Sequence, residues 1–324
     1  MMAAMAVERE TLMRAIEAAV LAPSSHNSQP WRFQLLPDGV DLFADRLREL
    51  PVVDPEGREL TISCGAALFH LRLALRQAGL VTEVSLLPGV GGGDHLARVR
   101  CVGRAEPTAH EQALFAAIQN RHTHRAAFAM QNVEAKLVGR LVEAAGTEGA
   151  SLRVLDAWQQ SSVAGWIAEG DRLQGANAEF RRELAAWVHA KDEENGVGMS
   201  AAQLGVHGLG ARLMPVFLRE FNWGRVQGRR DHKLAMSAPV LAVLVSRGDA
   251  ARDWLETGCA LGRMLLDATS MGLAASFLNQ AVEVPELRNK VRELLGGEGY
   301  PQMIVRLGYG VKTVRSARAE ALVR

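Results

Sequence analysis

The sequence predicts an α+β fold assembled from two related halves, and two observations carry this prediction. Segments with helical and with strand-like apolar spacing alternate along the chain. Shifting the chain by 193 residues places Gly79-Leu80 on Gly272-Leu273, and each pair ends a long helical pattern and precedes a strand-like run. Other matches on this shift are Gly65 with Gly258, Ala67 with Ala260, Leu68 with Leu261 and Leu73 with Leu266. Because the matches keep their order, we interpret the repeat as an internal duplication.

The first half is expected to span residues 1–105. Leu12, Ile16 and Val20 form an apolar stripe that predicts an opening helix. This helix should end at Ala22, because the residue before a proline disfavours helical backbone. A long helix should end at Gly79. Short apolar runs bounded by turn residues predict strands at 31–36, 40–43, 81–87 and 96–102.

The second half is expected to span residues 106–324. The same periodicities predict helices at about 134–145, 164–173, 181–190 and 252–271, and strands at 152–155, 239–245, 273–278 and 302–307. If the halves are related by an internal two-fold, the long helices at about 58–79 and 252–271 should pack against each other. Residues 191 to about 235 are glycine-rich and are predicted to be irregular.

An insertion at about 177–235 separates the regular elements of the second half. It contains Phe217 and Trp223, and a loop with large apolar residues needs something to bury them against. One interpretation is a lid whose aromatic side chains cover a ligand and control access to it. The alternative is an elaborated surface loop that packs on itself. We favour the lid.

Composition and charge narrow the functional classes. The chain has 324 residues, with 37 Lys and Arg against 36 Asp and Glu, so it lacks the net field that attracts nucleic acid or an anionic membrane. No window of membrane-spanning length is free of charge. Three widely spaced cysteines indicate a reducing compartment rather than a disulfide framework. We therefore expect a cytoplasmic protein without a nucleic-acid or membrane partner.

A polar loop bracketed by prolines runs from the first helix into the first strand, at residues 23–31 with the sequence PSSHNSQPW. Its hydroxyl groups, amides and backbone N–H groups can meet the heteroatom edge of a planar ligand. The alternative is an ordinary turn with local Asx and Ser hydrogen bonds, and composition alone favours that alternative.

A second polar segment, Arg121-His-Thr-His-Arg125, lies between two predicted helices. Arg121 and Arg125 can converge on a phosphate, since guanidinium groups offer forked donors and keep their charge, and Thr123 can add a hydroxyl. The alternative is a solvated basic turn. No metal is expected here, because no cysteine or carboxylate cluster accompanies the two histidines.

Each half carries the polar segment that the other half lacks. Where the first half has the loop at 23–31, the second half has only a short turn at 146–150. The segment at 121–125, which precedes the first helix of the second half, has no counterpart before the first helix of the first half. This complementarity points to one composite site rather than two.

The segments RHTHRAAF (121–128) and PSSHNSQPWRF (23–33) together resemble the two FMN-binding motifs of the flavin-dependent nitroreductase family. The strings DPEGRELTISCGAAL (54–68) and GLAASFLNQ (272–280) resemble the Acg subfamily found among actinobacteria. In the family the Arg motif precedes the Pro-Ser-Ser motif, and the two meet across a homodimer interface. The reversed order here implies a nitroreductase-like fold fused into an intrachain pseudo-dimer that holds one FMN.

The resemblance implies cofactor-binding residues from both halves. Arg121 and Arg125 would hold the FMN phosphate and pyrimidine edge, with Thr123 adding a hydrogen bond. Asn279 and Gln280 fall beside flavin N5, although the family's usual Glu-Gly is absent. The loop residues expected to line the isoalloxazine and the ribityl chain are Pro23, Ser24, Ser25 and Asn27, with Gln29 nearby. The family's C-terminal basic pair would be Lys312 and Arg315, whose spacing departs from the usual pattern.

The function that the resemblance implies is an FMN-dependent oxidoreductase. Electrons would pass from NAD(P)H through flavin N5 to a small-molecule acceptor, a nitroaromatic or a quinone, and no protein side chain need act as an essential acid or base. A rival function is flavin sequestration. A closed lid would place Phe217 or Trp223 over the flavin ring and hold FMN idle. A third is a structural pseudo-enzyme without flavin. With both halves in one chain, we expect a monomer.

Overall fold

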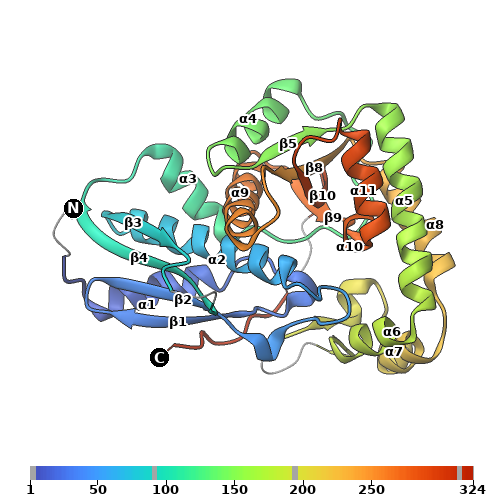
Figure 1. The fold of residues 1–324 in the computed structure, drawn as a ribbon, viewed down its shortest axis with the longest axis horizontal. Coiled ribbons are helices and arrows are strands. Elements are labelled where there is room, and N and C mark those ends of the chain that lie inside the picture. Colours follow the sequence, from blue (N-terminus) through green and yellow to red (C-terminus); the bar gives the residue numbers. More distant parts are fainter. Residues whose placement is uncertain (1–4, 90–92, 192–195, 312–315, 324) are drawn as a thin grey trace.

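The computed structural model describes residues 5–89, 93–191, 196–311 and 316–323 and contains two four-stranded sheets (Figure 1). The first sheet has the order β1-β2-β4-β3, and all its pairs are antiparallel. Helix α1 precedes it in the chain, and helix α2 connects β2 to β3. The elements of this half are α1 (Arg9–Ala19), β1 (Trp31–Leu36), β2 (Gly39–Ala44), α2 (Arg58–Gln77), β3 (Leu80–Leu86) and β4 (His95–Arg104).

The second sheet repeats this topology. Its order is β5-β8-β10-β9, again with only antiparallel pairs, and helix α9 connects β8 to β9 as α2 connects β2 to β3. The elements that correspond to those of the first half are α4 (Ala135–Gly146), β5 (Ser151–Val154), β8 (Val240–Ser246), α9 (Ala251–Ser270), β9 (Ala274–Phe277) and β10 (Tyr300–Gly308). The mixed α+β fold expected from the sequence is observed.

The long helices α2 and α9 pack against each other between the two sheets, which confirms the predicted contact (Figure 1). Their backbones meet at two glycines: a Cβ on Gly258 would lie only 2.7 Å from Cα of Gly65. The two cores interlock at this crossing. Ile62 of α2 packs in the apolar core under the second sheet, while Leu255 and Leu266 of α9 pack in the core of the first half.

Helix α3 (Ala109–Ile118) joins the halves and packs against both α2 and α9. Thr108 caps its N-terminus in a capping box with Glu111, which satisfies the free N–H groups of the first turn. The chain then passes beside β9, where the His124 backbone N–H donates to the carbonyl of Ala275 at 2.8 Å. This bond fixes the segment 121–125 against the second sheet.

The prediction that residues 191 to about 235 are irregular is wrong. Most of this stretch is helical, in α7 (Gly208–Glu220) and α8 (Gly224–Met236). The glycines that suggested irregularity serve packing instead: a Cβ on Gly228 would stand 2.7 Å from the carbonyl oxygen of Ala168 on α5. Glycine thus lets α8 lie directly on α5 (Figure 1).

The remaining elements are α5 (Ala157–Ala176), α6 (Ala178–Ala186), the short parallel pair β6 (Val188–His189) and β7 (Met199–Ser200), the 3₁₀ turn Ala201–Leu204, α10 (Gln280–Glu283) and α11 (Pro285–Leu294). Among them, α10 and α11 pack with α5 and with α8 on the second sheet in one apolar core. Helices α6 and α7 lie together beside the lower ends of α5 and α8 (Figure 1).

The segment 316–323 leaves the second half and runs along the first, where the chain end lies near β1 (Figure 1). The backbone N–H of Phe33 donates to the carbonyl of Leu322 at 2.9 Å, and Phe33 forms a parallel bridge with Val323. The segment that follows the last strand in sequence therefore connects the second half to the first.

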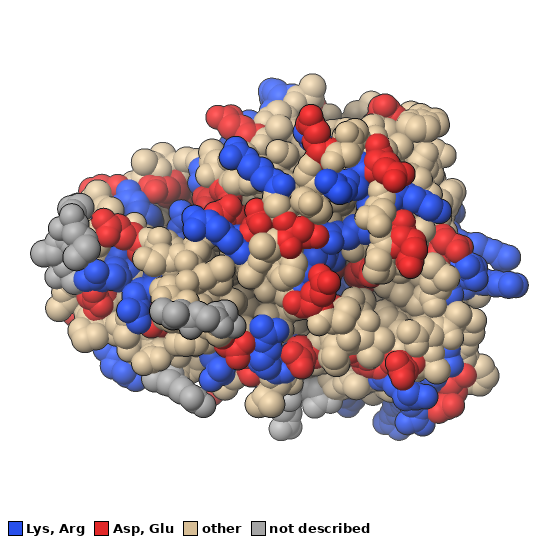
Figure 2. Space-filling view, viewed as in Figure 1, with Lys and Arg blue, Asp and Glu red and all other residues tan. Residues whose placement is uncertain are grey.

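On the molecular face in Figure 2, basic and acidic side chains are interspersed, in keeping with the near-zero net charge. Within the ranges that the structure describes, no helix combines the length and apolar character needed to cross a bilayer. Cys64, Cys101 and Cys259 are buried and free.

Candidate functional site

A cavity of about 670 Å³ lies between the two halves, and both contribute to its wall. This volume is in the range of small-molecule and cofactor sites. Several parts of the chain meet there, among them the loop after α1, the first turns of α2, the segment after α3, the turn between β9 and α10, the α5–α8 region and the C-terminal segment. The predicted site and lid residues that line it are Pro23, Ser24, Ser25, Asn27, Thr123, Arg125, Phe217, Trp223, Asn279 and Gln280.

The loop after α1 has an unusual backbone for its sequence. His26, Asn27 and Gln29 all have positive φ, at 50°, 55° and 53°. Left-handed backbone is uncommon for residues other than glycine and persists only where the surroundings enforce it. Local bonds help to enforce it here: Ser24 Oγ accepts from the Gln29 N–H at 3.0 Å, and the Ser24 carbonyl accepts from the Asn27 N–H at 3.1 Å.

The side chain of Asn27 connects three segments that are far apart in sequence. Its amide nitrogen donates to the carbonyls of Gly196, Gly198 and Ala317 at 2.9–3.1 Å, and its oxygen accepts from Arg318 Nη1 at 2.6 Å. Asn27 therefore holds the cavity wall together.

Gln29 and Arg121 do not line the cavity. The Gln29 side chain is buried beside it, donating to Gly196 O at 2.8 Å and accepting from the Ala319 N–H at 3.0 Å. Arg121 is also buried, directly after α3. Lys312 and Arg315 lie outside the described residues.

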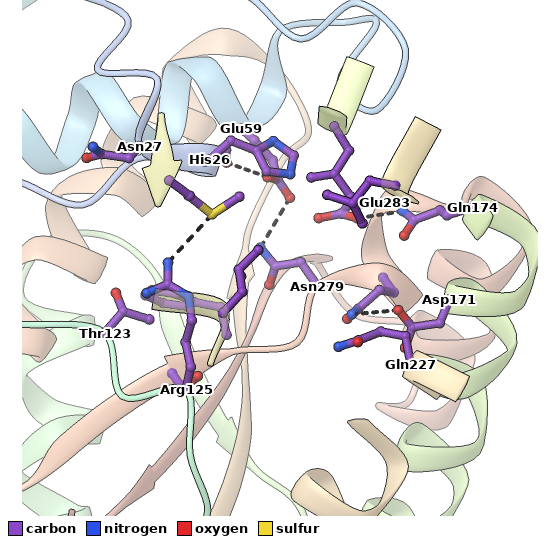
Figure 3. A pocket seen from close by; sticks show the side chains of 18 of the residues that line it. His26, Asn27, Glu59, Thr123, Arg125, Asp171, Gln174, Gln227, Asn279 and Glu283 are labelled. Carbon is purple, nitrogen blue, oxygen red and sulfur yellow. Dashed lines mark hydrogen bonds between the residues drawn. The ribbon is translucent and has the colours of Figure 1, made fainter. Parts of the chain in front are cut away.

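Arg125 is the cation at one end of the cavity, beside Thr123 (Figure 3). Its one described polar contact is Nη2 with the sulfur of Met199 at 3.8 Å, and in the described ranges no carboxylate pairs with it. Burial lowers the pKa of the guanidinium, and burial together with Arg125 lowers the pKa of the neighbouring His26 to about 4. This end of the cavity presents positive charge without a counter-charge.

The opposite side carries carboxyl and amide groups, among them Asp171, Gln174 and Glu283 (Figure 3). Between the two ends, Asn279 donates to Glu59 Oε1 at 3.2 Å, and its own oxygen accepts from the Ile304 N–H at 3.0 Å. Glu59 Oε2 accepts from Ser25 Oγ at 2.6 Å. Asn279 and Ser25, predicted from opposite halves, thus meet on one carboxyl group.

Several lining residues were not predicted. Glu59 lies inside the string at 54–68 that carries part of the resemblance, so its position offered a signal. Asp171, Gln174 and Glu283 lie in ordinary helical sequence, and only the packing of α5 against α10 brings them together. Arg318 lines the cavity from the C-terminal segment, close to the predicted basic pair.

A model of the nitroreductase family matches residues 3–56 and 118–309 of the chain. A relative from Mycobacterium tuberculosis named "Putative NAD(P)H nitroreductase acg" is 31% identical over 306 residues, covering 93% of this chain and 90% of its own. A second protein of that organism, "Putative NAD(P)H nitroreductase Rv3131", is 31% identical over 310 residues, covering 93% and 86%.

Solved structures similar to the chain include the FMN-dependent nitroreductase NfnB of Mycobacterium smegmatis in complex with NADPH. It has 18% identity and a TM-score of 0.42, and the match covers 64% of this chain and 94% of that one. The family match spans most of the chain and agrees with relatives above 30% identity along nearly its whole length. The chain belongs to the nitroreductase family.

Proposed function

We propose that this protein binds one FMN in the cavity between its halves and acts as an NAD(P)H-dependent oxidoreductase. The observation that carries the proposal is the partly buried and desolvated guanidinium of Arg125, which faces a cavity of about 670 Å³ without a carboxylate partner in the described ranges. A buried charge without a partner is costly, so its retention favours an anionic ligand. The phosphate or the pyrimidine edge of FMN would supply that partner.

The groups that line the cavity fit FMN. Arg125 and Thr123 offer donors to anionic or carbonyl oxygens at one end. The loop at 23–27 presents hydroxyl groups and exposed backbone beside them, and its positive φ values shape the wall. Apolar side chains such as Met199, Leu261 and Phe277 provide surface for a planar ring system.

When bound, FMN would supply the site that accepts a hydride from NAD(P)H and passes electrons to a nitroaromatic or quinone acceptor. The protein's part is to bind and orient. Arg125 provides positive potential beside the ligand, and Asn279, held by Glu59 and the Ile304 N–H, fixes the turn beyond β9. The apolar residues of α7 and the Trp223 region limit the access of water.

A second candidate function is flavin sequestration, and one observation favours it. Phe217 and Trp223 both line the cavity, and Met199 contacts Arg125, so the region 199–223 covers the site. Trp223 Nε1 donates to the Leu218 carbonyl at 3.2 Å, which holds the end of α7 to the start of α8. A cover held in this position would exclude the nicotinamide ring and leave FMN bound but idle.

We also propose that the two halves, at residues 1–105 and 106–324, arose by duplication and that the protein is a cytoplasmic monomer. The shared strand order of the two sheets and the α2–α9 crossing support the duplication. Because both polar segments reach one cavity within one chain, a second copy is not needed to complete the site. A light-scattering mass of twice the chain would contradict the monomer.

The test of the function is a visible absorbance spectrum of the purified protein, followed by anaerobic addition of NADPH. A flavin spectrum that bleaches on the timescale of turnover supports the oxidoreductase. A flavin spectrum that persists under NADPH but bleaches with dithionite supports sequestration. Absence of a flavin spectrum, even after incubation with FMN, contradicts both.

A further inference from the structure

The end of the cavity away from Arg125 is built from carboxyl groups on several helices. Asp171 comes from α5 and Glu283 from α10, and both line the cavity (Figure 3). Asp231 of α8 lies just behind them: Gln280 Nε2 donates to Asp171 Oδ1 at 3.1 Å and to Asp231 Oδ2 at 2.9 Å. Glu59 of α2 completes the group.

These carboxyl groups differ in how they are compensated. Glu59 has a cation beside it, since Arg58 Nη2 lies 3.3 Å from Glu59 Oε1. Asp171 and Glu283 are contacted by neutral amides: Gln280 donates to Asp171, and Gln174 donates to Glu283 at 2.6 Å. In the described part of the chain, neither forms an ion pair.

No N–H group in the described ranges donates to the second oxygen of Asp171, whose carboxyl group also interacts with that of Asp231. The Asp171 side chain is 2% exposed and lines the cavity. A buried carboxyl oxygen without a donor costs free energy, because it has lost its water and gained nothing in return. The chain retains this cost at the edge of a ligand cavity, where a ligand can supply the donor.

Three arginines act on this end. Arg230 of α8, which also lines the cavity, and Arg306 of β10 act on Asp231, while Arg58 of α2 acts on Glu283 and offsets only part of the effect of burial. Burial raises the pKa of both Asp171 and Glu283 to about 8, with a further contribution from neighbouring carboxylates: Asp231 acts on Asp171, and Glu59 acts on Glu283. Both groups hold protons at neutral pH that a bound cation would displace.

The two ends of the cavity therefore differ in chemistry: one carries Arg125, which has no carboxylate partner in the described ranges, and the other carries the carboxyl groups of Asp171 and Glu283. Arg125 attracts the phosphate of FMN, which leaves the carboxyl end to another group. We propose that the carboxyl end at Asp171 and Glu283 binds a cationic group, an ammonium or amidinium, carried by an aromatic electron acceptor. This inference rests on the proposed function and names its substrate class.

The aromatic surroundings suit such a ligand. Phe180 and Trp223 also line the cavity, with ring centroids 6.3 Å apart. The backbone at Gly224, next to Trp223, packs against Asp171 and Arg172. Aromatic faces near a carboxylate attract cations through their quadrupole and offer surface to an aromatic ring.

The test uses two redox-inert probes of the same shape, cationic benzamidine and neutral benzamide. Binding to the FMN-loaded, oxidised protein is measured by isothermal titration calorimetry in buffers of different ionisation enthalpy. We expect benzamidine to bind about tenfold more tightly than benzamide at pH 8, since a hydrogen bond to a charged group is worth at least that ratio. Its affinity should rise between about pH 6.5 and pH 8, with release of a proton below pH 8.

The variants Asp171→Asn and Glu283→Gln should abolish the preference for benzamidine and its pH dependence. Glu298→Gln is the matched control, because this carboxyl is exposed on the surface and should retain both. Equal binding of the two probes to the wild-type protein, or a preference that survives both cavity variants, would overturn the inference.

The same titration on protein without FMN separates this inference from the proposed function. If the protein does not take up FMN but still prefers benzamidine, the cation subsite is supported and the proposed oxidoreductase function is contradicted. If the protein takes up FMN and shows no preference, the proposed function stands and the cation subsite is contradicted.

Discussion

Gly65 on α2 and Gly258 on α9 lie against each other where the two helices cross, and neither position has room for a side chain. A Cβ on Gly65 would lie 2.8 Å from Cα of Gly258, and the reverse substitution is equally close. The obstructing atoms are backbone, which cannot move aside as a flexible side chain can. This crossing sets the distance between the two halves, and the cavity lies between those halves.

Gly65→Ala should therefore lower the free energy of unfolding by about 1–3 kcal/mol, the usual cost of overpacking a well-packed interior. Guanidinium titration measures it. The control is Gly139→Ala on α4, where an added Cβ meets no atom within 4 Å and helix propensity should make the change neutral or stabilising. Equal stability of the two variants would show that the crossing tolerates a wider separation.

Arg125→Ala should weaken FMN binding by about 10- to 100-fold, the range expected for loss of a charge-assisted hydrogen bond. Its unfolding free energy in the absence of FMN should not fall, because the substitution removes a partly buried charge that has no carboxylate partner in the described ranges. Fluorescence titration of FMN measures the first quantity and thermal unfolding the second. Arg14→Ala, an exposed arginine on α1, is the control. Unchanged FMN affinity of Arg125→Ala would remove this residue from the site.

Stability should fall as the pH rises from about 5 to 8, the interval between the ordinary pKa values of these carboxyl groups and their raised values. The pKa values of Asp171 and Glu283 are raised to about 8 in the folded protein, so the native state holds protons that the unfolded chain has released. Each proton contributes a slope of up to about 1.4 kcal/mol per pH unit against the native state in this range. His26 opposes this trend on the acidic side, because its pKa is lowered from 6.5 to about 4 in the folded protein and its contribution to stability therefore rises with pH over that interval. The fall due to the two carboxyl groups is thus clearest between about pH 7 and pH 8.

Chemical denaturation at a series of pH values checks this slope. Asp171→Asn should flatten it, and Glu298→Gln should not, because Glu298 is exposed. A slope that is the same in all three proteins would mean that the cavity carboxyls ionise normally in the folded state.

Trp223→Ala should accelerate the bleaching of bound flavin by NADPH, since the side chain lines the cavity and its Nε1 ties α8 to the Leu218 carbonyl. Stopped-flow absorbance measures the rate. Trp158→Ala is the matched control, because Trp158 lies on α5 with 69% of its surface exposed. If both variants react at the wild-type rate, the region 199–223 does not control access.

Sequence reasoning recovered the two sheets and the paired long helices because their signals are local. The apolar periodicity of α2 and α9, each ended by Gly-Leu, needs no knowledge of tertiary contacts. The helices α7 and α8 were missed for the opposite reason. Gly224 and Gly228 read as helix breakers in the sequence, whereas in the fold they are the positions at which α8 approaches α5.

Sequence reasoning named residues that line the cavity on the side where the polar motifs are contiguous. Ser25, Thr123 and Arg125 stand in short polar strings that any ligand-binding loop would need. Asp171 and Glu283 stand alone among apolar and charged helix residues, and a buried carboxylate looks like a solvated one until its neighbours are known. Gln29 was predicted to lie near the ligand. In the structure its side-chain amide instead hydrogen-bonds to the backbone of Gly196 and Ala319, a role that no spacing in the sequence indicates.

The C-terminal segment also has a consequence for the order of synthesis. Arg318 donates to Asn27 and to the Ala22 carbonyl, and Ala319 donates to Gln29, so residues made about 290 positions later secure this loop. The first sheet can assemble while the ribosome is still working, since domains tend to fold from the N-terminus onward. The loop at 23–29 cannot reach its observed geometry until residue 319 has emerged. The cavity wall therefore forms late in synthesis, and a nascent chain that has not reached residue 319 carries its ligand site unassembled.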